Sequence, residues 1–124
     1  MAIPISIQEA ISKSYLLTQE QIDFYQKNRF IKLKQVFNAE TIGYFNTVIS
    51  AKVAEMNQVK TKVDERDTYG KAFLQLFNLW REDEHIQQFV FSKRLAKIAA
   101  DLMQVDGVRL YHDQALFKEG GGGI

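Results

Sequence analysis

The two histidines of this chain are the side chains best suited to metal or acid–base chemistry, and neither sits in a complete site. His85 lies in the stretch EDEH, and His112 is followed directly by Asp113. A non-haem iron site needs two histidines and one carboxylate on the same side of the metal. His112 and Asp113 are neighbours in a predicted strand, so they face opposite ways. The sequence therefore predicts no metal ligand and no catalytic residue here, and the acids around His85 indicate a solvated helix start.

Polar residues also follow one face of the predicted last strand, residues 108–118. Because side chains alternate along a strand, one face carries Val108, Leu110, His112, Gln114, Leu116 and Lys118. An imidazole, an amide and an ammonium group among apolar residues could line a ligand pocket. The same pattern is typical of a strand face that meets solvent, and the sequence leaves both interpretations open.

Two amides interrupt the apolar stretch AFLQLFNLW, residues 72–80. A short apolar run of this kind is typical of a strand buried on both faces. A buried amide without a partner costs about 1–3 kcal/mol, so Gln75 and Asn78 either contact a ligand or brace a neighbouring loop. In a regular strand, residues three apart point to opposite faces, so at most one of the two faces a given pocket.

Composition excludes several classes of protein. The 124 residues are enough for one domain with a core. Sixteen basic residues against fifteen acidic ones give a net charge of +1, which favours neither nucleic acid nor a membrane surface as partner. The absence of cysteine excludes disulfides and fits the predicted cytoplasmic location. The start has no signal-peptide pattern, and no window approaches the roughly 18 apolar residues of a membrane span.

The first half of the chain reads as a leader, a helix, a strand and a second helix. Residues 1–17 are predicted to be a loosely attached leader, and residues 18–124 a single domain. Thr18 followed by Gln21 is a capping-box pattern that predicts a helix start. The alternating stretch FIKLKQV, residues 30–36, predicts a short strand. Asn38 is a good N-cap for a second helix, one face of which carries Ile42, Phe45, Ile49 and Val53.

The second half adds two helices between the two predicted strands. Residues 59–71 lack periodicity and are predicted to be an exposed loop. DEHIQQFVF, residues 83–91, predicts a short helix, and Ser92 is the expected cap of a third clear helix, with Leu95, Ile98, Ala99 and Leu102 on one face. The order of elements predicts an α+β fold, with helices at the front and the sheet only beginning at the end.

Several of these stretches together resemble the phytanoyl-CoA dioxygenase family, in its bacterial branch. The resemblance covers residues 17–124 and rests on LTQEQIDFYQKNRFIKL, KAFLQLFNLW, SKRLAKIAADLM and GVRLYHDQALFKEGGGGI. The chain departs from the family at Arg29, where many relatives have glycine before the phenylalanine. The family implies a double-stranded β-helix (jelly-roll) core, so the helices are expected to buttress its first strands.

The resemblance implies an oxidoreductase that uses Fe(II) and 2-oxoglutarate to hydroxylate a small-molecule substrate. Gln114 matches a strand position that contacts the cosubstrate, Lys118 on the same face could help to hold an anion, and Gln75 or Asn78 matches a region that approaches it. The family's H-x-D iron ligands follow the glycine loop, so they are expected beyond Ile124. We therefore expect an apparently truncated N-terminal portion that binds no cofactor and is inactive alone.

The alternative is a small non-catalytic binding or interaction module derived from such an enzyme. Its last strand would need cover, because an unpaired edge invites self-association. Cooperative unfolding of a monomer would favour this module, whereas aggregation or an exposed apolar patch would favour a fragment.

Overall fold

The protein combines helices with one small sheet, as predicted for an α+β chain. The computed structural model describes residues 2–56 and 74–117, so the loop predicted at residues 59–71 lies outside the described residues. In chain order the elements are α1 (Ile5–Ser12), α2 (Gln19–Asn28), α3 (Ala39–Met56), β1 (Leu74–Phe77), the 3-10 turn η2 (Leu79–Arg81), α5 (Glu84–Val90), α6 (Lys93–Met103) and β2 (Gln114–Phe117). Within these residues, the sheet consists of β1 and β2 alone. None of the helices described is long and apolar enough to cross a membrane.

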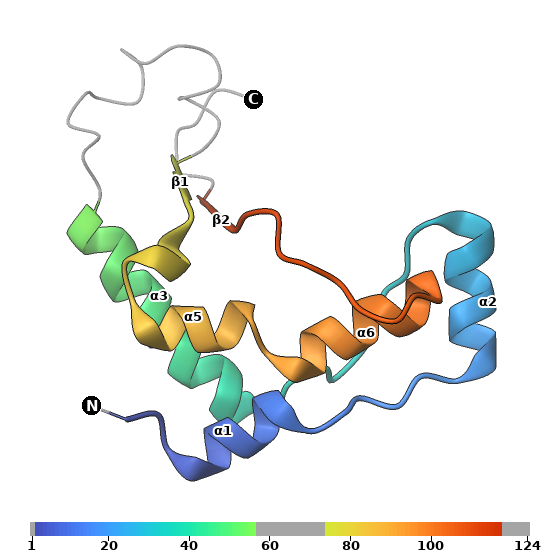
Figure 1. Ribbon diagram of the computed structural model, residues 1–124. Helices are drawn as coiled ribbons and strands as arrows, with labels where there is room; N and C mark the ends of the chain where they lie inside the picture. The colour runs from blue at the N-terminus through green and yellow to red at the C-terminus, as the bar shows by residue number, and fades with distance from the viewer. Residues whose placement is uncertain (1, 57–73, 118–124) are drawn as a thin grey trace.

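The helices form a layer that separates the sheet from helix α2. Figure 1 shows α3 crossing α5, with α1 beside the start of α3 and α6 following α5. Helix α2 packs against α6 at one end of the molecule, and β1 and β2 lie at the other end. The sheet is therefore supported from one side by α3, η2 and α5.

The helices begin where the sequence predicts caps. The Thr18 hydroxyl accepts a hydrogen bond from the Gln21 N–H, and the Gln21 side chain accepts one from the Thr18 N–H. Asn38 Oδ1 accepts an amide N–H one turn into α3 at 2.8 Å, and Ser92 Oγ does the same for α6 at 3.2 Å. Each cap satisfies an otherwise orphaned donor and contributes about 1 kcal/mol. The three predicted caps are confirmed.

The first core cluster joins the N-terminal residues to helix α3. Its members are each at most 5% exposed: Ile3, Ile7, Ile11 and Phe45. Ile7 and Ile11 lie four residues apart on one face of α1, and Ile3, just before the helix, continues the same spacing, so the three pack together with Phe45 of α3. The expectation of a loosely attached leader is therefore wrong for this segment, because its apolar spacing places it in the core.

The buried face of α3 is slightly rotated from the predicted one. Phe45 and Val53 are buried, and Ile49 packs against the core, as expected. Ile42, however, is 52% exposed, whereas the neighbouring Thr41 is completely buried. The buried stripe of α3 therefore passes through Thr41, four positions before Phe45, instead of Ile42.

The strand predicted at residues 30–36 is absent. These residues form an irregular connection, in which Gln35 has a left-handed backbone with φ 57°. Their carbonyls bond to side chains: Tyr15 Oη donates to Lys34 O at 2.7 Å, and Arg94 Nε donates to Val36 O. Alternation alone predicted the strand, but the neighbouring elements are helices and supply no strand for it to pair with.

Both remaining predicted strands are much shorter than expected. Residues 72–80 were expected to form a strand buried on both faces, yet β1 ends at Phe77, which is 53% exposed. Asn78 adopts a left-handed conformation with φ 56° and starts the turn η2. Of the strand predicted at residues 108–118, only the four residues of β2 are in the described sheet; toward the start of the predicted strand the pairing stops at Gln114, because its partner Phe77 is the last residue of β1.

Candidate functional site

The sheet brings together two of the stretches that contain candidate binding residues, one with Gln75 and the other with Gln114. In the antiparallel register Gln75 pairs with Leu116, and Phe77 pairs with Gln114. The intervening pair, Leu76 with Ala115, packs against a second core cluster, which consists of Val53, Leu79 and Ile86. One face of the sheet is therefore closed by α3, η2 and α5.

The opposite face, which we call the outer sheet face, carries Phe77, Gln114 and Leu116. Phe77 is 53% and Leu116 48% exposed, and Gln114 is exposed as well. The ring of His112 lies edge-on to that of Phe77, with 5.9 Å between the ring centroids. This face thus combines an amide and an imidazole with apolar surface, and no described element covers it.

Asp113 fixes the end of β1 to the start of β2. Its two carboxylate oxygens each accept a backbone N–H at 3.0 Å, one from Leu79 and the other from Trp80. Its own carbonyl accepts the N–H of Asn78 at 2.9 Å. The carboxylate therefore satisfies the free donors at the start of η2 and holds the turn beside the sheet.

The four predicted cosubstrate-binding residues have different positions. Gln114 lies on the outer sheet face, and Gln75 pairs with Leu116 two register positions away, although the side chain of Gln75 lies outside the description. Asn78 is not in the strand at all; its backbone starts the turn and is bonded to Asp113. Lys118 lies outside the described residues. The condition of a regular strand through both Gln75 and Asn78 is not met, because β1 ends at Phe77.

The two histidines occupy separate environments. His85 Nδ1 and the Tyr44 hydroxyl share a hydrogen bond of 2.9 Å between α5 and α3. His112 instead contacts the rings of Phe77 and Tyr111. Across residues 2–56 and 74–117, no three histidine, aspartate or glutamate side chains converge as a metal site. The described residues therefore do not fit the ligand set that Fe(II) requires.

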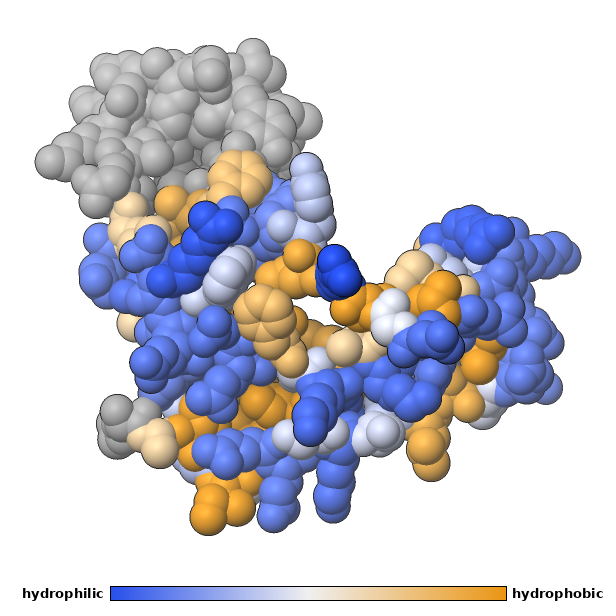
Figure 2. Space-filling model, in the orientation of Figure 1, coloured by the Kyte–Doolittle hydropathy of each residue, from blue (hydrophilic) through white to orange (hydrophobic). Residues whose placement is uncertain are grey.

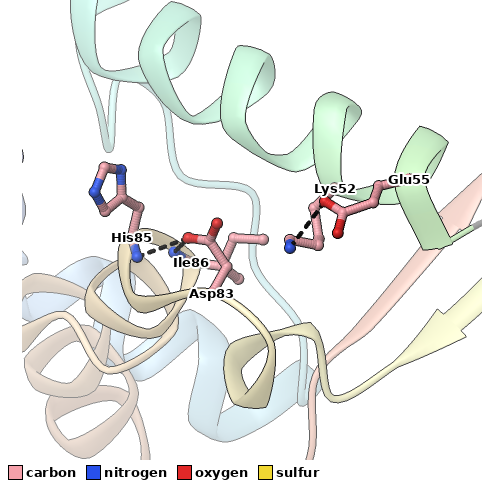
Figure 3. Close-up of polar contacts among 5 residues, drawn as sticks. All are labelled: Lys52, Glu55, Asp83, His85 and Ile86. Carbon is pink, nitrogen blue, oxygen red and sulfur yellow. Dashed lines mark hydrogen bonds and ion pairs between the residues drawn. The ribbon is translucent and has the colours of Figure 1, made fainter. Parts of the chain in front are cut away.

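The acidic stretch around His85 is a helix start. Asp83 Oδ1 accepts the N–H groups of His85 at 2.7 Å and Ile86 at 3.0 Å, which makes it the N-cap of α5 (Figure 3). On the adjacent helix α3, Lys52 Nζ forms an ion pair with Glu55 at 3.0 Å. The hydrogen bond to Glu55 is the main cause that raises the pKa of Lys52, and the nearby charges of Glu55, Asp83 and Glu82 raise it further. The predicted helix start is confirmed.

Two polar contacts went unnoticed in the sequence. One joins the Asp113 carboxylate to the amides of η2, and the other joins the Tyr44 hydroxyl to His85. Asn78 carried a usable signal, because asparagine tolerates the left-handed conformation and so favours a turn over a continuous strand. No local pattern connects Tyr44 to His85, since the pair is 41 residues apart.

Comparison of the chain with models of protein families, with curated proteins and with solved structures gave no match.

Proposed function

We propose that this chain is the N-terminal part of an Fe(II)/2-oxoglutarate-dependent dioxygenase of the phytanoyl-CoA dioxygenase family, which hydroxylates a small molecule. The chain contributes the helical layer and the first two strands of a jelly-roll core. The observation that carries the proposal is the pairing of β1 with β2. These strands lie in two of the stretches on which the resemblance rests, and they meet although a long segment separates them in sequence.

The conformation of Arg29 supports the resemblance where the sequence departs from it. Arg29 follows α2 with φ 64° and ψ 19°, in the left-handed region. Glycine adopts this conformation without a steric penalty, and it is the residue most often found just after a helix. The glycine that many relatives have at this position would therefore suit the turn that this chain makes.

In this proposal the chain positions cosubstrate but does not hold the iron. Gln114 keeps the cosubstrate contact that the resemblance gives it, and it lies on the exposed outer sheet face. Lys118 and Gln75 keep the supporting roles that the resemblance gives them. Since the described residues do not fit Fe(II), the iron ligands belong to other parts of the polypeptide, and no oxidation step is assigned to this chain.

Two measurements test the proposal. The 124-residue chain, supplied with Fe(II), 2-oxoglutarate and oxygen, is expected to form no succinate; turnover would contradict the placement of the iron ligands. The coding sequence downstream of Ile124 is expected to contain an H-x-D motif within a few tens of bases. Its absence in every reading frame would contradict the assignment to the family.

A non-catalytic binding module is the second candidate, and the first core cluster favours it. Ile3, Ile7 and Ile11 close over Phe45 using residues of this chain alone, so part of the fold needs no further domain. Cooperative unfolding of the 124-residue chain, together with a downstream sequence that lacks H-x-D, would support this candidate over the enzyme.

A further inference from the structure

Residues 108–112, which we call the connecting run, have the sequence of a strand but no partner strand within residues 2–56 and 74–117. All five residues are exposed, and Tyr111 is 93% exposed. In the described parts of the chain, backbone pairing on this side starts only at Asp113, whose carbonyl accepts the Asn78 N–H. Figure 1 shows the connecting run as bare coil between α6 and β2. Unpaired N–H and C=O groups in an extended segment are a template for another strand.

The connecting run also presents apolar side chains that the rest of the chain covers poorly. Val108 is 36% and Leu110 37% exposed. Both border a hollow of about 420 Å³, whose other walls include Phe91, Leu95 and Met103 of the α5–α6 region. Hydrophobic surface gathers around the central hollow of the molecule in Figure 2. A strand added beside the connecting run would bury part of this surface.

We propose that the connecting run is a dimerisation strand that pairs antiparallel with the connecting run of a second copy of this chain. Asp113 already bonds to the β1–η2 turn through its carbonyl and its carboxylate, so the unpaired segment ends at His112. The midpoint of the segment is Leu110. A two-fold axis through Leu110 pairs every residue of the run and gives the self-complementary interface expected of a closed dimer.

The side chains suit this register. Leu110 meets Leu110 of the second copy, and Val108 meets His112 of the second copy. Arg109 stands opposite Tyr111 of the second copy, where a guanidinium can lie over an aromatic ring. No like charges face each other. A parallel, in-register pairing would instead place the two Arg109 side chains side by side, which is destabilising. Charge therefore selects the antiparallel arrangement.

A charge-swap series tests both the dimer and its register by sedimentation velocity over a concentration series. The unmodified chain is expected to show a concentration-dependent monomer–dimer equilibrium. Tyr111→Lys puts a lysine opposite Arg109 at two symmetric positions, so the dimer dissociation constant should rise by about tenfold or more. The double variant Arg109→Glu/Tyr111→Lys pairs opposite charges and should restore the dimer.

Phe24→Lys is the matched control, because Phe24 is another exposed aromatic residue, 44% exposed, and lies on α2. It should leave the equilibrium unchanged, and circular dichroism should show that every variant keeps its helices. A wild-type chain that stays monomeric at the highest concentration would overturn the proposal. So would Tyr111→Lys with unchanged association, or a folded double variant that fails to re-associate. None of these outcomes depends on dioxygenase activity.

Discussion

The two ends of the molecule differ in how far each closes its own apolar surface. At the N-terminal end, Ile3, Ile7 and Ile11 cover Phe45, and each member of this first core cluster is at most 5% exposed. At the C-terminal end, the outer sheet face and the connecting run leave apolar side chains open, with Phe77 at 53% and Leu116 at 48%. The difference is that residues of this chain close the first core cluster, whereas no described element covers the outer sheet face.

The sharpest test of this difference compares one truncation at each end. Phe45→Ala removes a ring that is 2% exposed, so the free energy of unfolding should fall by about 3–5 kcal/mol. Leu116→Ala removes a half-exposed side chain, and the loss should stay below about 1 kcal/mol. Chemical denaturation of both variants measures the two values. Equal losses would mean that the sheet face is buried in solution.

The contacts of Asp113 hold the start of β2 against the turn η2, and so attach the sheet to the helices. In Asp113→Asn the amide nitrogen replaces one acceptor, so one of the two η2 amides loses its partner and stability should fall by about 1–2 kcal/mol. Hydrogen exchange at the Leu79 and Trp80 amides should accelerate. Asp106→Asn, at an exposed position, is the control and should change neither quantity. Unchanged exchange in the Asp113 variant would show that the carboxylate is dispensable.

The N-terminal end contains one buried hydroxyl group without a hydrogen-bond partner among the described residues, and a substitution can remove it. Thr41 is completely buried, and its hydroxyl oxygen has no hydrogen-bond partner among the described residues. Thr41→Val keeps the shape and removes the unsatisfied group, so stability should rise by about 1 kcal/mol. Thr47→Val, at an exposed position on the same helix, should have little effect. A destabilised Thr41 variant would indicate that the hydroxyl has a partner in solution.

The smallest expected effect concerns the turn after α2. Arg29→Gly should relieve the left-handed backbone and stabilise the protein by about 0.5–1 kcal/mol. Lys27→Gly, two residues earlier and inside the helix, should instead destabilise it by about 1 kcal/mol. Thermal unfolding of the two variants measures both changes in stability, one an increase and the other a decrease. Destabilisation by both glycines would argue against the left-handed turn.

The helix starts were predictable because their signals are local. Thr18 and Gln21 lie three residues apart, and Asn38 and Ser92 each cap the helix that follows directly. The strands were not predictable in length, because a strand depends on a partner that the sequence does not identify. Residues 30–36 alternate like a strand but lie among helices, and Asn78 ended β1 early.

The strand pattern predicted the position of Gln114 but not that of Asn78. Gln114 was expected on a polar strand face, and it lies on the exposed outer sheet face. Asn78 was expected in the same kind of position but forms a turn, because its left-handed backbone and its bond to Asp113 outweigh the apolar run around it. The role of Asp113 depends on the approach of two distant segments, which no local pattern encodes.

Arg94 has a consequence for the order in which the protein can assemble. Its guanidinium donates to Val36 O and to Lys13 O, which are 58 and 81 residues earlier in the chain, and it lies over the ring of Tyr15. A ribosome releases both of those segments well before it makes Arg94. They acquire this partner only once α6 has emerged, so the two connections on either side of α2, together with α2 itself, reach their final places late in synthesis.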